Sequence, residues 1–139
     1  PAAPAAPGRL LSTGPSYAWL KVGEGCRHKC AFCTIPSIRG PLRSLPAADL
    51  REEARGLLAG GVRELVLVAQ DLTSWGSDFD TPQSLPHLLD ELLPLDRLTW
   101  LRLLYLYPSG VTPELLRYMR EAGPQLLPTS PCSTPIPRC

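Results

Sequence analysis

The segment Val62–Ala69 reads VRELVLVA and ends in an unbroken apolar run. Such a run is typical of a strand that is buried on both faces, as the strands of parallel α/β sheets are. Parallel neighbours need a crossover connection, and that connection is usually a helix. The segment therefore predicts a parallel sheet whose strands are joined by helices.

Segments of strand and helix character alternate around this run. Strand starts that lie roughly 40 residues apart leave room for a right-handed crossover between each pair. The order β-α-β-α-β-α predicts an α/β fold with three βα units, either complete in itself or part of a larger wound or barrel fold. The predicted strands are 17–22, 62–69 and 100–107, the predicted helices are 46–59, 84–93 and 112–123, and 23–45 is predicted as a long loop.

Both ends of the chain are rich in proline. Residues 1–16 read as a semi-rigid linker, residues 17–123 as the globular part, and residues 124–139 as a disordered tail, because five prolines among these last sixteen residues leave little apolar pattern to bury. The 14 basic and 13 acidic residues nearly cancel, which gives no charged stripe for a polyanion. We also expect no signal peptide and no membrane-spanning helix, since no apolar run approaches about 18 residues.

Cys26, Cys30 and Cys33 form a C-x3-C-x2-C motif in the loop after the first predicted strand. Parallel α/β folds carry their chemistry at the carboxyl ends of strands, and the motif occupies such a position. Three thiolates can hold a four-iron cluster and leave one iron open, whereas ferredoxin clusters use four. The open iron can chelate the amino and carboxylate groups of S-adenosylmethionine, so the motif predicts a [4Fe-4S] cluster that cleaves this cofactor to a deoxyadenosyl radical.

Two other uses of these cysteines stay open from the residues alone. Structural zinc sites use four protein ligands, so a zinc site would combine the three motif cysteines with His28 or His87. A disulfide with one remaining thiol is the other use. The odd total of five cysteines, in a chain without a secretory signal, favours a reduced, cytoplasmic site instead. Cys132 and Cys139 lie in the tail and are expected to take no part.

The stretch YAWLKVGEGCRHKCAFCTIPSIRGPLRS, residues 17–44, resembles the start of a radical S-adenosylmethionine domain of the methylthiotransferase family. Three softer segments resemble the branch that modifies ribosomal protein S12 more than the branch that modifies tRNA. They are residues 35–40 (IPSIRG), 69–71 (AQD) and 103–108 (LLYLYP). The resemblance covers about residues 9–128. It implies that residues 17–123 are a partial radical SAM core, the first three βα units of a six-unit TIM-like barrel.

The resemblance also implies roles for single residues. Cys26, Cys30 and Cys33 would hold the cluster. Phe32, just before the last cysteine, would lie near the adenine, and Gln70 and Asp71 would contact the methionine end of S-adenosylmethionine. Tyr105 and Tyr107 are expected either to face the barrel interior or simply to pack.

For the parent enzyme, the resemblance implies a cytoplasmic methylthiotransferase that modifies the β-carbon of an aspartate in ribosomal protein S12. Its electrons would come from a reductant such as flavodoxin or ferredoxin, and this segment is expected to bind neither membrane nor nucleic acid. A tRNA-adenosine methylthiotransferase and a non-enzymatic zinc-binding module are the alternatives. Family members carry further domains on both sides, so the chain alone is expected to be inactive. Its end from residue 129 departs from the family pattern and is expected to be out of frame.

Overall fold

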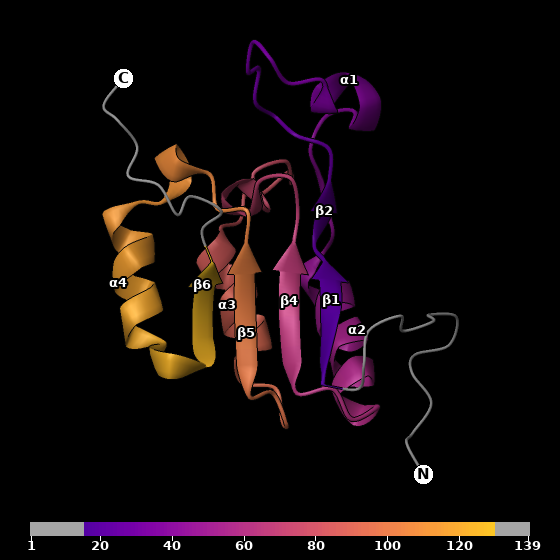
Figure 1. Ribbon diagram of the computed structural model, residues 1–139, viewed down its shortest axis with the longest axis vertical. Helices are drawn as coiled ribbons and strands as arrows, with labels where there is room; N and C mark the ends of the chain where they lie inside the picture. The colour runs from indigo at the N-terminus through magenta and orange to yellow at the C-terminus, as the bar shows by residue number, and fades with distance from the viewer. Residues whose placement is uncertain (1–15, 130–139) are drawn as a thin grey trace.

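Four strands form one parallel sheet in the computed structural model, which describes residues 16–129 (Figure 1). Each strand pairs with the next sheet strand along the chain, as expected for successive βα units. The predicted α/β fold is confirmed, and the sheet is consistent with part of a βα barrel. In sheet order the strands are β1 (Tyr17–Lys21), β4 (Glu64–Val68), β5 (Trp100–Leu104) and β6 (Leu126–Thr129).

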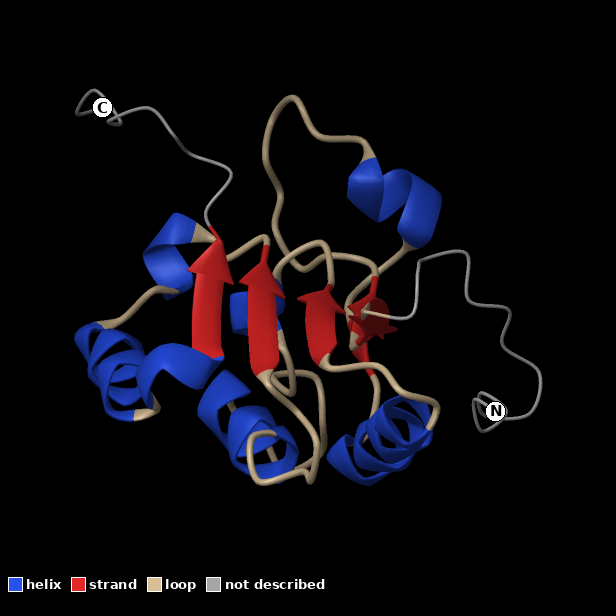
Figure 2. Cartoon of the chain, turned by 60° about the horizontal axis from the view of Figure 1, so that its bottom comes forward, coloured by secondary structure: helices blue, strands red, loops and turns tan. Residues whose placement is uncertain are grey.

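Three helices connect the sheet strands and lie on one face of the sheet (Figure 2). They are α2 (Ala47–Ala59), α3 (Leu85–Leu92) and α4 (Pro113–Glu121). The Thr112 side chain accepts a hydrogen bond from Leu115 N and so caps α4, whereas Pro46 is the N-cap of α2 and not its first residue. The core lies between sheet and helices, because alternate strand side chains such as Leu20, Leu67 and Leu103 are fully buried there.

The prediction of an unbroken loop over residues 23–45 is wrong. The segment contains β2 (Gly23–Glu24), which pairs with β3 (Arg43–Ser44) in an antiparallel ladder, and the short helix α1 (Ile35–Arg39). Two-residue strands and a five-residue helix are too short to produce a hydrophobic period in the sequence. The ladder closes the base of an excursion that carries the cysteine motif.

The structure also corrects the predicted boundary of the tail. Residues 124–129 were expected to be disordered, but they complete the 3-10 turn η3 (Gly123–Gln125) and form β6, whose register pairs Leu126 with Leu101. Leu126 is buried, and Gln125 Nε2 donates to the carbonyl oxygens of Leu93 and Leu98 at 3.3 and 3.0 Å. These contacts offset the entropy cost of ordering the segment, which the prediction from proline content had expected to dominate. Residues 130–139 and 1–15, which hold the rest of the predicted tail and linker, lie outside the described residues.

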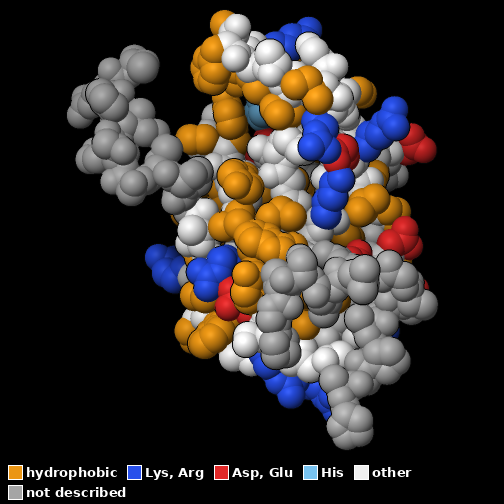
Figure 3. Space-filling model, turned by 45° about the vertical axis from the view of Figure 1, so that its right-hand side comes forward, with side chains coloured by type: hydrophobic (Ala, Val, Ile, Leu, Met, Phe, Trp, Pro, Cys, Tyr) orange, Lys and Arg blue, Asp and Glu red, His pale blue; other side chains and the backbone are white. Residues whose placement is uncertain are grey.

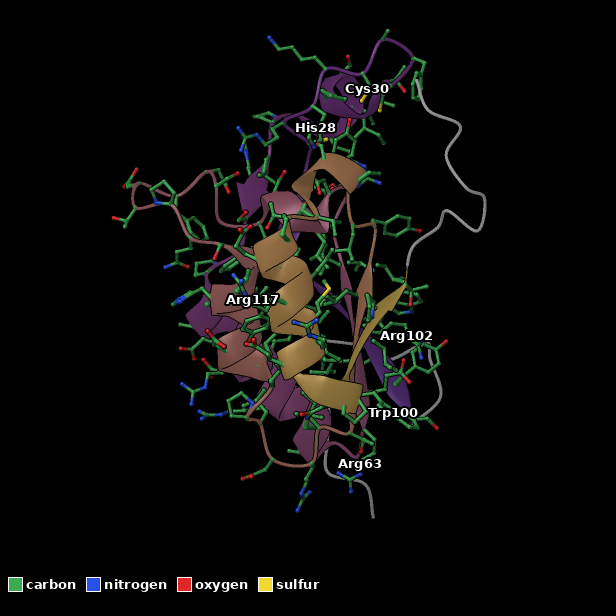
Figure 4. All side chains as sticks on the ribbon, turned by 90° about the vertical axis from the view of Figure 1, so that its left-hand side faces the viewer. His28, Cys30, Arg63, Trp100, Arg102 and Arg117 are labelled. Atoms are coloured by element: carbon green, nitrogen blue, oxygen red, sulfur yellow. The ribbon has the colours of Figure 1, made fainter. Side chains whose placement is uncertain are left out.

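The second face of the sheet carries large side chains that the helices do not cover. Trp19 and Trp100 are exposed, and Arg102 Nε donates to Glu64 Oε1 across neighbouring strands at 2.6 Å. Figure 4 places Trp100 and Arg102 on the side of the sheet away from α4, and Figure 3 shows hydrophobic side chains gathered in the middle of the molecule in that view. Within residues 16–129, none of the helices has the length and apolar character needed to cross a bilayer.

Candidate functional site

The cysteine loop, residues 25–34, rises above the carboxyl ends of the sheet strands (Figure 4). Gly25 starts it with φ +72°, and a Cβ there would lie 2.1 Å from the Pro41 carbonyl oxygen, so only glycine fits. Cys26 N donates to Gly40 O at 3.2 Å, which joins the two arms of the excursion. Cys33 N donates to Cys30 O at 3.0 Å and closes a turn between these two cysteines.

The three thiols line one cavity of about 530 Å³. Cys26, Cys30 and Cys33 are free and half-buried. The lining crosses three parts of the chain that are distant in sequence: the cysteine loop, the residues after β4 and the residues after β5. Besides the cysteines it consists of His28, Phe32, Ile35, Ala69, Gln70, Tyr105 and Tyr107.

Asp71 is the buried ionisable residue next to this cavity. Its carboxylate accepts hydrogen bonds from Thr73 N at 2.9 Å, from Thr73 Oγ1 at 2.6 Å and from Ser74 Oγ, and so caps the 3-10 turn η1 (Leu72–Ser74). Its second oxygen lies 2.6 Å from His28 Nε2. Burial would raise the pKa of Asp71, but the hydrogen bonds, those from Ser74 and Thr73 first, outweigh it and lower that pKa.

Tyr107 connects β5 to the cysteine loop. Its ring stacks on the His28 imidazole, with centroids 3.9 Å apart and planes at 22°. The charge and hydrogen bonding of the Cys30 side chain, more than burial, raise the pKa of Tyr107. The strand ends before Tyr107 because Tyr105 takes φ +60°, and the Tyr105 carbonyl accepts a hydrogen bond from Leu72 N at 3.1 Å. A left-handed tyrosine is costly, and such strain is commonly found at functional sites.

Gln70 and Glu24 form a second polar contact at the cavity. Gln70 Nε2 donates to Glu24 Oε1 at 3.1 Å, while Gln70 Oε1 is buried without a hydrogen-bond partner in the structure. Buried acceptors are nearly always paired, so this amide oxygen is suited to a donor on a bound molecule. The hydrogen bond from Lys21 lowers the pKa of Glu24, which keeps this carboxylate charged beside the cavity.

The structure brings most of the predicted site residues together, but not all in the same way. Gln70 lines the cysteine cavity, whereas Asp71 lines the neighbouring hollow beneath His28. Phe32 stands at the cavity with its ring 92% exposed, so it is free to cover a ligand. His87 is exposed on α3 and lines the groove between α2 and α3, away from the cysteines.

The sequence analysis missed two residues of the site. His28 was considered as a zinc ligand, as charge around an anionic cluster or as exposed loop charge, but not as a partner of Asp71, which is 43 residues away in the sequence. Glu24 was not singled out. The Asp71-Leu72-Thr73-Ser74 segment carries a visible signal, because an aspartate followed by hydroxyl residues is typical of a side-chain cap. No local pattern connects His28 to its partner.

One protein family, described as the Radical SAM superfamily, has a model that matches residues 20–131 of the chain. This match covers the end of β1, the cysteine loop and the strands β4, β5 and β6.

Individual relatives are similar over most of the chain. A protein of Nitratidesulfovibrio vulgaris (strain DP4), named ribosomal protein uS12 methylthiotransferase RimO, is 66% identical over 122 residues, which are 88% of this chain and 28% of that protein. Proteins of the same name from Oleidesulfovibrio alaskensis and Lawsonia intracellularis are 59% and 53% identical, over 88% and 86% of this chain and 28% and 27% of their own length. The chain therefore spans little more than a quarter of these curated relatives.

Proposed function

Because the chain belongs to the radical SAM superfamily, we propose that Cys26, Cys30 and Cys33 bind a [4Fe-4S] cluster and that the cavity beside them receives S-adenosylmethionine. The observation that carries the proposal is the convergence of three free thiols on one cavity at the carboxyl ends of parallel strands. When bound, the cluster and S-adenosylmethionine supply a reductive cleavage that yields a carbon radical.

The donor set and the cavity fit these groups. A volume of about 530 Å³ lies within the range of small-molecule sites, and the walls are largely aromatic and aliphatic. Among the described residues, no three His, Cys, Asp or Glu side chains are spaced to hold a single metal ion. A cluster needs no such spacing, because each thiolate binds a different iron.

Three residues are proposed to orient S-adenosylmethionine. The unpaired Gln70 amide oxygen would accept a hydrogen bond from the ammonium or a hydroxyl group of the ligand. The exposed Phe32 ring would close over the adenine, since aromatic rings favour offset stacking. Asp71 is proposed to act on the methionine end through the loop, because its carboxylate is occupied by protein donors.

The overall reaction is proposed from the relatives, whose printed name assigns them to ribosomal protein uS12. The whole protein would add a methylthio group to the β-carbon of an aspartate in that substrate. Its electrons would come from a flavodoxin or ferredoxin, in the cytoplasm. The chain described here would supply the cysteine loop and part of the barrel, and would not by itself complete the transfer.

Anaerobic reconstitution with iron and sulfide tests cluster binding. We expect the chain to turn brown, to contain close to four irons per chain and, with dithionite and S-adenosylmethionine, to release 5′-deoxyadenosine. Cys30→Ala should lose most of the iron. Cys132→Ala is the matched control, because it removes a thiol that lies outside the motif, and it should keep the iron of the parent chain.

Two results would contradict the proposal. One is a colourless chain that binds one zinc and no iron, which indicates a zinc module. The other is a Cys30→Ala variant that retains the full iron content of the Cys132→Ala control.

A further inference from the structure

The cysteine loop lies at the tip of an excursion from the sheet. The excursion leaves the body at β2 and returns at β3, and its internal bonds, such as Cys26 N to Gly40 O, join only its own two arms. Between the cysteines, residues 27 and 29 are exposed. The position between them is different: the His28 side chain is 26% exposed and is turned toward the strand ends.

His28 contacts the segments that follow two neighbouring strands. On one side its Nε2 lies 2.6 Å from the Asp71 carboxylate, which follows β4 and is itself 3% exposed. On the other its ring lies flat against Tyr107, which follows β5. The His28 backbone N–H donates to Cys26 Sγ at 3.5 Å, so the same residue also orients the Cys26 thiol.

The Asp71 end of this contact is rigid. Three hydrogen bonds from η1 hold the carboxylate independently of His28. A hydrogen bond between a fixed buried carboxylate and an imidazole is directional and strong. The stack on Tyr107 restricts the remaining rotation of the His28 ring, because a rotated ring would lose this contact.

We propose that His28 is a positioning residue that fastens the cysteine loop over the carboxyl ends of β4 and β5, through Asp71 and Tyr107. The inference rests on the proposed cluster at Cys26, Cys30 and Cys33. By holding the loop in the metal-free chain, His28 reduces the ordering that cluster binding would otherwise require. It acts on the cluster from outside the ligand set, as the hydrogen-bonded partners of metal ligands do.

The metal-free chain provides the first test, because Arg27 and Lys29 flank His28 and are trypsin sites. Asp71→Asn removes the charge that holds His28 and leaves the cleavage sites unchanged. We expect cleavage after Arg27 and Lys29 to become roughly tenfold faster in this variant, and to accelerate more than cleavage after Arg55, which lies in α2 and reports unfolding of the whole chain. Equal cleavage of the loop in the variant and the parent chain would overturn the inference.

The second test uses the reconstituted chain and measures how fast a chelator removes iron. His28→Ala should lose iron roughly tenfold faster than the parent chain, the usual size of a second-sphere effect. His28→Gln keeps an N–H group that can reach Asp71 and should recover part of the loss. His87→Ala removes the exposed histidine of α3 and should behave as the parent chain does.

A third variant tests the ring contact. Tyr107→Phe keeps the ring against His28, so its iron retention should equal that of the parent chain, and faster iron loss would contradict the proposed role of the stack. A parent chain that takes up no cluster contradicts the proposed function. A parent chain that takes one up, with His28→Ala equal to it in iron loss, contradicts this inference alone.

Discussion

Replacement of Asp71 by alanine should lower the free energy of unfolding by about 3 kcal/mol. The side chain is 3% exposed and accepts hydrogen bonds from the Thr73 amide and the Thr73 and Ser74 hydroxyls, besides its contact with His28. The two hydroxyls can turn to water, but the amide and the imidazole are fixed. A buried donor left without an acceptor costs about 1–3 kcal/mol, and two of them give the stated loss.

Urea unfolding followed by circular dichroism measures this loss. With a slope near 1.5 kcal/mol/M, about 3 kcal/mol lowers the midpoint by about 2 M. Asp71→Asn keeps one acceptor oxygen and should lose less than alanine does. Asp80→Ala is the matched control, since Asp80 is exposed and its loss should stay within about 0.5 kcal/mol. Equal midpoints for the Asp71→Ala and Asp80→Ala variants would refute the account of Asp71 as a cap.

The pH dependence of stability follows from the same carboxylate. Because the folded pKa of Asp71 is lowered from its ordinary value of 3.8, the folded state binds its proton less tightly than the unfolded state does. Asp71 therefore contributes its full stabilisation above pH 3.8, and the contribution is lost as the pH falls through that value toward the folded pKa. The parent chain should lose more stability between pH 5 and pH 3 than Asp71→Asn does, and parallel pH profiles would contradict this.

Two further substitutions test the fold around the site. Gly25→Ala should destabilise the chain more than Gly123→Ala. Both glycines have φ near +73°, a conformation that costs an alanine about 1–2 kcal/mol. Of these two positions, only Gly25 would place the new Cβ against backbone, 2.1 Å from Pro41 O. Equal unfolding free energies for the two variants would show that the close contact is absent. Leu67→Ala in β4 should cost about 2–5 kcal/mol because the side chain is fully buried, whereas Leu116→Ala, at a 54% exposed side chain, should stay near the parent value, and calorimetry would show both.

The fold was predictable where the pattern was long enough to repeat. The apolar run of β4 and the alternation of strand and helix segments around it were predicted, and the structure keeps β4, α2 and α3 within one or two residues of their predicted bounds. The prediction failed at the C-terminal end, where proline content was taken as evidence of disorder. β6 forms there because β5 already presents an unpaired edge, and Leu126 is buried once it pairs. Pairing with a distant strand leaves no trace in a local window.

The candidate site was likewise predictable in part. The motif pointed to the three cysteines and the family resemblance pointed to Gln70, and all four residues line the cavity. His28 could not be found in this way, because its proposed role depends on contacts with Asp71 and Tyr107, which follow β4 and β5. Residues after different strands come together only because the parallel register brings the strand ends level, which is a property of the assembled sheet.

Fold and site use separate parts of the same sheet. Leu67 and Leu103 stabilise the chain through the helix-covered face, whereas the cysteine loop adds no residue to the hydrophobic core. Substitutions of the three cysteines should therefore change cluster binding without unfolding the sheet. Asp71 is the exception, because its carboxylate both caps η1 and holds His28. Substitution of Asp71 should therefore lower both the free energy of unfolding and the resistance of the cysteine loop to trypsin. The ratio of these two losses measures how tightly the site depends on the fold.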